Sequence, residues 1–175
     1  EKAKKFQVKI IIDLNWREVF WDYSNFSSEI SKIERVNLIK KFLNHAHILK
    51  LAKEEATLFF RNENPRLISQ QMSKRPDVII TDGKNPVEWF INGYQGTTDT
   101  PDSQKIVDTT GAGDAFLAGL ISKFIVSDYP SNELEIQDCV NFASVCGLLT
   151  CLGEGAIEQQ PDYVKVNKFL GSFIK

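Results

Sequence analysis

Features that mark several classes of protein are missing from this 175-residue sequence. No apolar run approaches the about 18–20 residues of a membrane-spanning helix, and no signal-peptide pattern opens the chain. Lysine and arginine number 21 and aspartate and glutamate 23, so the formal net charge is −2 and no basic face is indicated. We therefore expect a globular protein without nucleic-acid or membrane partners.

Cysteine and histidine are scarce and do not form an evident metal site. Cys139, Cys146 and Cys151 fall in one segment, without Cys-x-x-Cys spacing. An odd number of cysteines in a helix predicted to be buried is typical of reduced thiols, which favours a cytoplasmic protein. His45 and His47 form a His-x-His pair, but no third ligand is spaced nearby, so packing is favoured over metal binding.

Strands alternate with helices along the chain. This alternation implies parallel βαβ units and an α/β sheet with ligands at the carboxyl ends of its strands, where Asp13, Leu51, Thr81 and Asp108 are expected. The expected strands are 8–13, 47–51, 77–83, 86–93 and 104–108; the fourth pairs with the third through a turn at 83–86, and a polar loop covers 97–103. The first expected helix begins at Ser27 or Ser28 and ends at Leu43. The other expected helices are 52–60, 65–75, the residues after Asp114 to about 126, 132–149 and 162–173.

The organisation of the chain is simple. No internal repeat, low-complexity tract or Pro/Gly/Ser linker divides it, which predicts one α/β domain over residues 1–175. The chain begins at Glu1 rather than Met, and its first 13 residues are typical of a helix end followed by a strand. We therefore expect a piece of a longer polypeptide.

The stretch from Val107 to Phe116, VDTTGAGDAF, carries the clearest chemical signal. Gly111 and Gly113 lack side chains where a helix is about to begin, so an anion can approach the free amides of the first turn. The neighbouring Asp114 would repel that anion unless it accepts a proton from an attacking hydroxyl. Phosphoryl transfer to an alcohol needs both functions. The alternative is an ordinary tight turn with an acid in the first helical turn.

Two other phosphate-binding motifs are excluded by spacing. The sequence contains no GxxxxGK[ST] stretch, which excludes a P-loop. Phe116 stands where the dinucleotide-binding fingerprint has its third glycine, so that motif fails as well.

The nine residues from Asp108 to Phe116, DTTGAGDAF, closely resemble the C-terminal signature of the ribokinase-like carbohydrate kinases, the PfkB family. The resemblance covers nearly the whole chain and implies a ribokinase-like three-layer αβα sandwich. Only its C-terminal, nucleotide-binding part is present, since the N-terminal sugar-pocket half and the β-sheet lid have no counterpart. Four further stretches follow in the family's order: 13–21 (DLNWREVFW), 48–56 (ILKLAKEEA), 79–83 (IITDG) and 141–157 (NFASVCGLLTCLGEGAI).

The resemblance implies a role for each matching residue. Asp114 would be the catalytic base, and Gly111, Ala112 and Gly113 would form the amide anion hole. Glu55 occupies the glutamate of an Asn-x-x-Glu element associated with Mg²⁺ through water, although Ala52 replaces its asparagine. The remaining implied roles are nucleotide binding for Lys50, Thr81, Gly83, Asn141 and Gly147, substrate or phosphate binding for Asp13, Asn15 and Arg17, and a monovalent cation site, with K⁺ as the candidate, for Asp108 and Thr110.

Simpler interpretations stay open beside these roles. Glu55 and its neighbour Glu54 also suit a solvated helix face, and Lys50 could extend its charge to solvent. Asp13 and Arg17 suit an ordinary strand-exit turn, and Asp108 an ordinary turn residue. For Gly147, plain helix packing is favoured over contact with the nucleotide.

The implied activity is that of an ATP-dependent kinase that transfers the γ-phosphoryl group to a sugar hydroxyl, with fructokinase favoured. A ketodeoxygluconate or nucleoside kinase of the same family and a non-catalytic scaffold are the alternatives, although the intact GAGD stretch argues against a scaffold. The implied ligands are ATP, Mg²⁺ and a sugar. Family dimers pair through the lid, which leaves a homodimer open for the longer protein.

Overall fold

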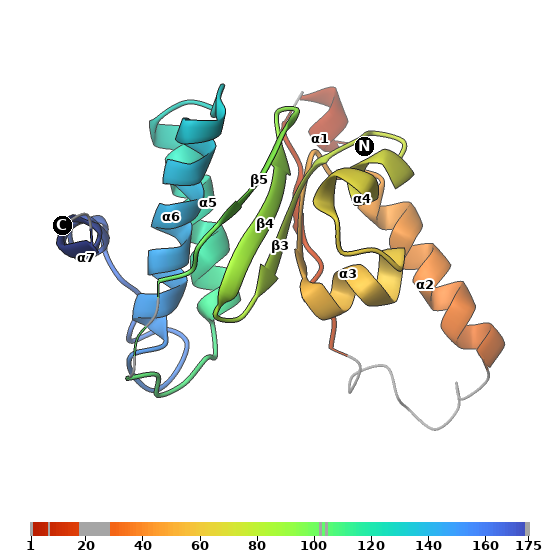
Figure 1. Cartoon of the computed structure of the whole chain (residues 1–175). Coiled ribbons are helices and arrows are strands. Elements are labelled where there is room, and N and C mark those ends of the chain that lie inside the picture. Colours follow the sequence, from red (N-terminus) through yellow and green to blue (C-terminus); the bar gives the residue numbers. More distant parts are fainter. Residues whose placement is uncertain (1, 7, 18–28, 102, 104, 174–175) are drawn as a thin grey trace. The chain divides into compact units, whose positions relative to one another are not determined.

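The computed structural model of the chain describes residues 2–6, 8–17, 29–101, 103 and 105–173. Its strands form a five-stranded sheet in the order β1-β2-β3-β4-β5, accompanied by helices, so the predicted α/β fold is confirmed (Figure 1). The chain divides into two compact units. The first unit comprises residues 1–80 with 89–93, and the second comprises 81–88 with 94–175.

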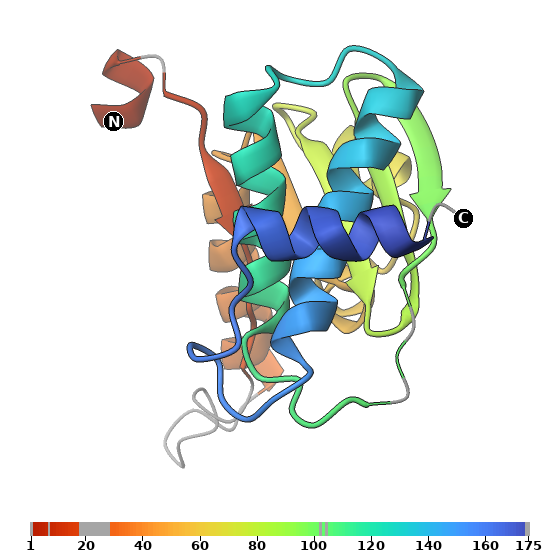
Figure 2. The same ribbon diagram turned by 90° about the vertical axis from the view of Figure 1, so that its left-hand side faces the viewer.

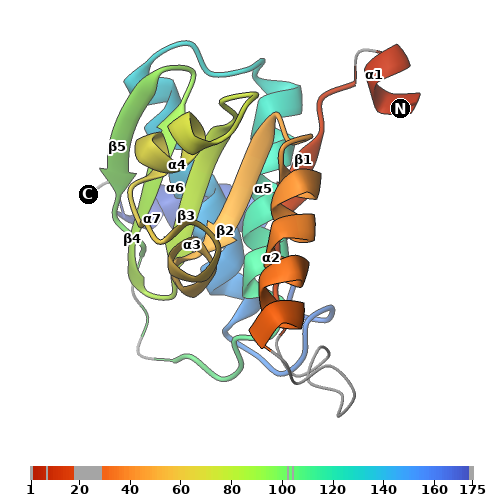
Figure 3. The ribbon, with the colours of Figure 1, turned by 90° about the vertical axis from the view of Figure 1, so that its right-hand side faces the viewer.

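The first unit contains a parallel strand pair and the helices that lie before, between and after these strands in the sequence (Figure 3). β1 and β2 pair in parallel with Ile11 opposite Ile48, as the alternation of strands and helices predicted. Its core includes the fully buried Leu43, Leu49 and Phe59. The elements are α1 (Lys2–Lys5), β1 (Ile11–Asp13), α2 (Glu29–Leu43), β2 (Ile48–Ala52), α3 (Lys53–Phe60), α4 (Pro65–Gln71) and β3 (Asp77–Asp82), which continues into the second unit.

The local sequence explains where α3 ends and where α4 begins. α3 stops at Arg61, which takes the left-handed conformation with φ of 51°. α4 begins after Asn64, whose side chain accepts a hydrogen bond from the Leu67 amide at 3.1 Å, and Pro65 occupies its first turn. The predicted serine cap of α2, at Ser27 or Ser28, lies outside the described residues.

Two tight turns connect β3, β4 (Asn85–Ile91) and β5 (Tyr94–Thr98). Only two residues join each pair, which requires the adjacent strands to run antiparallel. In the second turn Asn92 and Gly93 have φ of 49° and 85°, as a type I′ turn requires. The predicted pairing of β3 and β4 through a turn is confirmed. β5 was not predicted, because the polar stretch YQGTT carries no apolar alternation.

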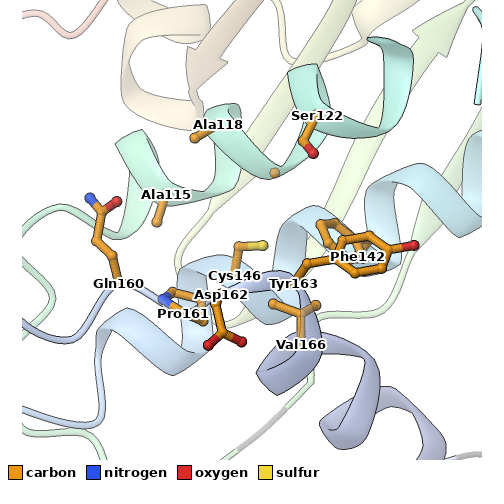
Figure 4. A pocket seen from close by; sticks show the side chains of 11 residues that line it. Ala115, Ala118, Ser122, Phe142, Cys146, Gln160, Pro161, Asp162, Tyr163 and Val166 are labelled. Carbon is orange, nitrogen blue, oxygen red and sulfur yellow. The ribbon is translucent and has the colours of Figure 1, made fainter. Parts of the chain in front are cut away.

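Helices dominate the second unit: α5 (Ala112–Val126), α6 (Glu133–Thr150) and α7 (Tyr163–Phe173). α5 and α6 pack closely at Gly119, where an added Cβ would lie 2.7 Å from the Cys146 sulfur. α7 crosses this pair, and Val166 is buried against it (Figure 2). A cavity of about 160 Å³ remains among the three helices, with Ala115, Cys146 and Val166 in its wall (Figure 4).

The predicted strand at 104–108 is wrong for the residues that the structure describes, 105–108. The amides of Val107 and Asp108 donate to the carbonyl oxygen of Cys151, at 2.8 and 3.4 Å, and thus bind the end of α6 instead of a neighbouring strand. Asp108 is therefore not at the end of a strand. None of the helices in the described ranges has the length and apolar character to cross a membrane.

Candidate active site

The start of α5 requires glycine for two reasons. Gly111 precedes the helix with φ of 81° and ψ of −3°, a left-handed conformation that disfavours residues with a Cβ. A Cβ at this position would also lie 2.8 Å from Cβ and 3.0 Å from Cα of Ala156. The loop after α6 therefore packs directly against the turn that opens α5.

The first turn of α5 leaves backbone amides available. The Ala112 amide donates to the Thr109 carbonyl at 3.2 Å, and the Ala115 amide to the Gly111 carbonyl at 2.9 Å. Within the described part of the chain, no acceptor is found for the amides of Gly113 and Asp114. No side chain caps the helix either. Free amides at the positive end of a helix dipole form an anion-binding site.

Asp114 lies in this first turn, three residues after Gly111, and its side chain is exposed. Among the described residues its carboxylate has no hydrogen-bond or ion-pair partner. A carboxylate without a protein partner, beside open amides, is available to accept a proton from a bound hydroxyl.

Asp108 organises the loop before α5. Its Oδ1 accepts hydrogen bonds from the Thr110 amide at 2.9 Å and the Thr110 hydroxyl at 2.7 Å, and its Oδ2 accepts one from the Gly155 amide at 3.1 Å. The hydrogen bonds from Thr110, with that from Gly155, hold the pKa of Asp108 below its ordinary value. Asp108 thus connects the signature loop to the loop after α6.

A cavity of about 480 Å³ in the second unit adjoins this helix start. Thr109, Ala112 and Gly113 form one part of its wall. At Gly147 an added Cβ would lie 3.1 Å from the Ala112 carbonyl oxygen, so glycine there permits the close approach of α6. The other lining residues are Thr81, Gly83, Lys84, Val87, Thr100, Pro101, Ser103, Ile106, Phe116, Ser144, Leu148 and Cys151.

The first unit carries a separate polar cluster at the ends of β1 and β2. Lys50 and Asp13 are opposite each other in the strand register, and their side chains form an ion pair at 2.8 Å. The two side chains are only 6% and 15% exposed, so Lys50 does not extend to solvent. A buried pair of this kind is strongly disrupted by removing either partner.

Glu55 binds the backbone on both sides of its carboxylate. One oxygen accepts the Trp16 amide, and the other accepts the Ala52 amide at 2.7 Å. The residue is 6% exposed, and this burial raises the pKa of Glu55 above its ordinary value, against the effect of the two amides. Glu55 therefore attaches the chain after β1 to the start of α3 and does not lie on a solvated helix face.

The neighbouring predicted residues are more open. Asn15 is exposed with φ of 46°, and the exposed Arg17 donates from one guanidinium nitrogen to the Trp16 carbonyl oxygen at 3.3 Å. Glu18 to Trp21, the end of the stretch that resembles the family, lie outside the described residues.

One histidine of the pair, His47, has a structural role. His47 Nδ1 accepts a hydrogen bond from the Ile10 amide at 2.9 Å, which connects β2 to the chain before β1. No cluster of three or more His, Cys, Asp or Glu side chains suited to a metal ion occurs in the ranges that the structure describes.

Comparison with known proteins decides the family. Residues 1–162 match the pfkB family of carbohydrate kinases. The chain belongs to this family. Fructokinase-1 of Oryza sativa subsp. japonica is 28% identical to it, over 98% of this chain and 52% of the rice protein. The chain thus spans about half the length of the relatives that it matches over its whole extent.

Solved structures of two fructokinases share the fold. Fructokinase from Xylella fastidiosa with bound ATP aligns with a TM-score of 0.82 and 22% identity, over 99% of this chain and 56% of that one. Fructokinase from Vibrio cholerae O395 in its fructose, ADP and calcium ion bound form aligns with a TM-score of 0.79 and 25% identity, over 97% and 53%. The predicted resemblance to ribokinase-like kinases is therefore confirmed.

The structure of this pfkB chain groups the predicted site residues unevenly. Thr81, Gly83 and Gly147 line the same cavity as the signature residues, but Asn141 does not. Asn141 lines another cavity, of about 440 Å³, together with Lys123 and Asp138. Sequence reasoning missed Ser144, which lines the first cavity one helical turn after Asn141. Its spacing of three residues from Gly147 was the available signal.

Proposed function

We propose that this chain is the nucleotide-binding and catalytic half of an ATP-dependent sugar kinase, with fructose as the favoured acceptor. The observation that carries the proposal is the start of α5, where the amides of Gly113 and Asp114 and the Asp114 carboxylate all lack a partner among the residues that the structure describes. Family membership and the rice relative named a fructokinase support it. The Vibrio cholerae fructokinase holds fructose and ADP, which supports the choice of acceptor.

In the proposed reaction the sugar hydroxyl oxygen forms a bond to the γ-phosphorus, and the bond to the β,γ-bridging oxygen breaks to release ADP. Asp114 accepts the hydroxyl proton. The amides of Gly113 and Asp114, for which the described residues offer no acceptor, donate to the phosphoryl oxygens as charge shifts during transfer, while the Ala112 amide stays bonded to the Thr109 carbonyl. The cavity holds the nucleotide, with Thr81, Gly83 and Gly147 in its wall.

The proposed roles of the cations follow the resemblance. Glu55 would hold Mg²⁺ through water, and the bound ion would supply positive charge that offsets the negative charge of the phosphates. Each oxygen of Glu55 already accepts a hydrogen bond from a backbone amide and keeps a further lone pair that could accept a bond from a metal-bound water. For K⁺ we propose Asp108 and Thr110, whose mutual hydrogen bonds leave oxygen lone pairs free.

The remaining assignments are proposals of the same kind. Arg17 and Asn15 are exposed, which suits binding of substrate or phosphate. Asp13 and Lys50 are occupied by their ion pair, so we expect them to hold the strand ends in place. Asn141 faces a different cavity from the other nucleotide residues, which favours a packing role.

The test is a coupled ADP-release assay on the full-length protein with fructose, ketodeoxygluconate, ribose and adenosine. Asp114→Asn is expected to lower kcat by about 10²–10⁴, with little change in ATP affinity measured by calorimetry. Glu133→Gln, at the exposed start of α6, is the matched control and should leave kcat unchanged. Unchanged kcat in Asp114→Asn would overturn the proposal.

Other outcomes select among alternatives. Preferred turnover of ketodeoxygluconate or adenosine would keep the mechanism and change the acceptor, while absence of both turnover and ATP binding would indicate a scaffold. We further propose a cytoplasmic location, one domain over residues 1–175 and a homodimer for the longer protein. Cell fractionation, a single cooperative unfolding transition and sedimentation equilibrium test these three points.

A further inference from the structure

In the turn after β1, one side chain that packs inward lies between two exposed ones in the sequence. Asn15 takes the left-handed conformation with φ of 46°, so the chain leaves the direction of the strand at this residue. Asn15 and Arg17 are exposed, whereas Trp16 is partly buried and packs against the core of the first unit. The conformation of this turn therefore depends on what holds Trp16.

One face of α3 contacts both the backbone and the ring of Trp16. The Trp16 amide donates to one carboxylate oxygen of Glu55, whose other oxygen accepts the Ala52 amide at 2.7 Å. The Trp16 ring meets Phe59 in an edge-to-face arrangement, with ring centroids 5.3 Å apart and an interplanar angle of 77°. Glu55 and Phe59 are four residues apart in the helix and both buried, so Trp16 is bound to a rigid surface.

The side chain of Arg17 is connected to Trp16 as well. One of its guanidinium nitrogens donates to the Trp16 carbonyl oxygen at 3.3 Å. Within the ranges that the structure describes, Arg17 has no other hydrogen-bond partner, and no carboxylate forms an ion pair with it. A guanidinium carries five N–H donors in a planar fork, so most of the donors of Arg17 remain available to a ligand.

The chemistry of Arg17 indicates which ligand group binds there. A guanidinium fork matches the oxygens of a phosphate, with which it forms two parallel hydrogen bonds. Of ATP and fructose, the proposed substrates, only ATP carries negative charge. A guanidinium that is already held in place loses less freedom on binding, and so binds the phosphate more tightly than one that moves freely.

We infer that Trp16 is a positioning residue, which holds the Arg17 guanidinium in place for a phosphate of the nucleotide. Glu55 acts through the Trp16 amide and Phe59 through the Trp16 ring. The inference rests on the proposed function, which makes ATP a substrate and phosphate binding a role of Arg17.

The experiment measures kcat and the KM for ATP of the full-length protein in the ADP-release assay. Arg17→Met should raise this KM about 10–100-fold, as expected for lost hydrogen bonds to a charged group. Trp16→Ala should raise it about three- to tenfold, because the guanidinium is present but must be immobilised when ATP binds. kcat should stay within about twofold of wild type in both, since a contact made equally with bound ATP and with the transition state changes KM alone.

Two further variants separate positioning from packing. Trp16→Phe keeps a ring against Phe59 and should bring the KM for ATP back to within about twofold of wild type. The double variant Trp16→Ala, Arg17→Met should have the same KM as Arg17→Met alone, because a residue that acts only through Arg17 has no effect once Arg17 is removed. If Trp16→Ala does not fold, Trp16→Leu, which also lacks the ring but keeps more apolar volume, replaces it.

Met72→Ala is the control for lost stability. Met72 is 4% exposed, belongs to the same core and precedes β3. The start of β3 lies beside the start of β2, since the Asp77 amide donates to the His47 carbonyl at 3.0 Å, whereas Trp16 follows the end of β1, beside the end of β2. Met72→Ala should lower the melting temperature and leave the KM for ATP unchanged, because partial unfolding reduces the amount of active protein and hence only the apparent kcat.

Four results would overturn the inference: a wild-type KM for ATP in Trp16→Ala or in Arg17→Met, additive effects in the double variant, a rise confined to the KM for fructose, or an equal rise in Met72→Ala. The proposed function stands in each case if Asp114→Asn still lowers kcat. If the wild-type protein turns over none of the acceptors, the proposed function and the inference both fail.

Discussion

Two helices of this chain carry an acid at the same position and use it in opposite ways. Glu55 is the third residue after Ala52 at the start of α3, and Asp114 is the third residue after Gly111 at the start of α5. Glu55 is buried and folds back to the Ala52 amide. Asp114 is exposed and has no partner among the described residues.

The difference arises from the residues around each acid. Ala52 has extended backbone with φ of −74° and ψ of 157°, and the longer glutamate side chain reaches its amide, as in half of a capping box. Gly111 is left-handed, and Asp114 is one methylene shorter. α3 thus supplies its own anion, whereas α5 leaves its first amides for an external one.

The largest expected effect concerns the polar cluster of the first unit, where Lys50 and Asp13 form their ion pair beside Glu55. Lys50→Met should destabilise the chain by about 3–5 kcal/mol, because it leaves the Asp13 carboxylate buried without its partner. Urea unfolding followed by circular dichroism measures this change. Lys53→Met removes the exposed ion pair to Glu63 at 3.6 Å and should cost less than about 1 kcal/mol. Similar losses for both variants would show that the Asp13–Lys50 pair is not effectively buried.

The next effect concerns the glycine turn that opens α5. Gly111→Ala should destabilise by about 2–5 kcal/mol, combining left-handed strain with overpacking against Ala156. Gly155 has a similar φ of 79°, but a Cβ there meets nothing within 4 Å. Gly155→Ala should therefore cost only about 1–2 kcal/mol. Equal melting-temperature shifts in the two variants would exclude the predicted collision with Ala156.

The smallest expected effects are opposite changes of folding stability with pH, at Glu55 and at Asp108. The pKa of Glu55 is raised by burial, so the stability it contributes is complete below its ordinary pKa and is lost as pH rises through the folded-state value. The pKa of Asp108 is lowered by hydrogen bonds from Thr110, so its contribution is present above its ordinary pKa and is lost as pH falls.

Urea midpoints between pH 3 and 7 separate these contributions. Glu55 makes the wild-type chain lose stability as the pH rises, and this loss should be absent in Glu55→Gln. Asp108 makes it lose stability as the pH falls, and this loss should be absent in Asp108→Asn. The same pH slope in both variants would contradict the opposite shifts.

The sequence anticipated features that depend on local chemistry. Gly111, Gly113 and the apolar run after Asp114 predicted a helix opened by glycine, and the structure has that helix from Ala112. Asn64 and Pro65 likewise predict the start of α4 through capping and the fixed φ of proline. These signals act within a few residues of each other.

Features that depend on distant partners were not accessible. Residues 105–108 have an apolar pattern suited to a strand, but the Cys151 carbonyl takes the amides of Val107 and Asp108. β5 forms from a polar stretch because the turn at Asn92 and Gly93 brings it against β4. Ser144 resembles any serine in an apolar helix until the cavity beside it is known.

Hydrogen exchange measured by NMR tests the central claim most directly. The amides of Gly113 and Asp114 should exchange rapidly in the ligand-free chain and slow when ATP and Mg²⁺ are added, since only the ligand supplies an acceptor. The Ala52 amide, bonded to Glu55, should be protected before any ligand is present. Strong protection of Gly113 and Asp114 in the free chain, or rapid exchange that ATP does not slow, would contradict the account.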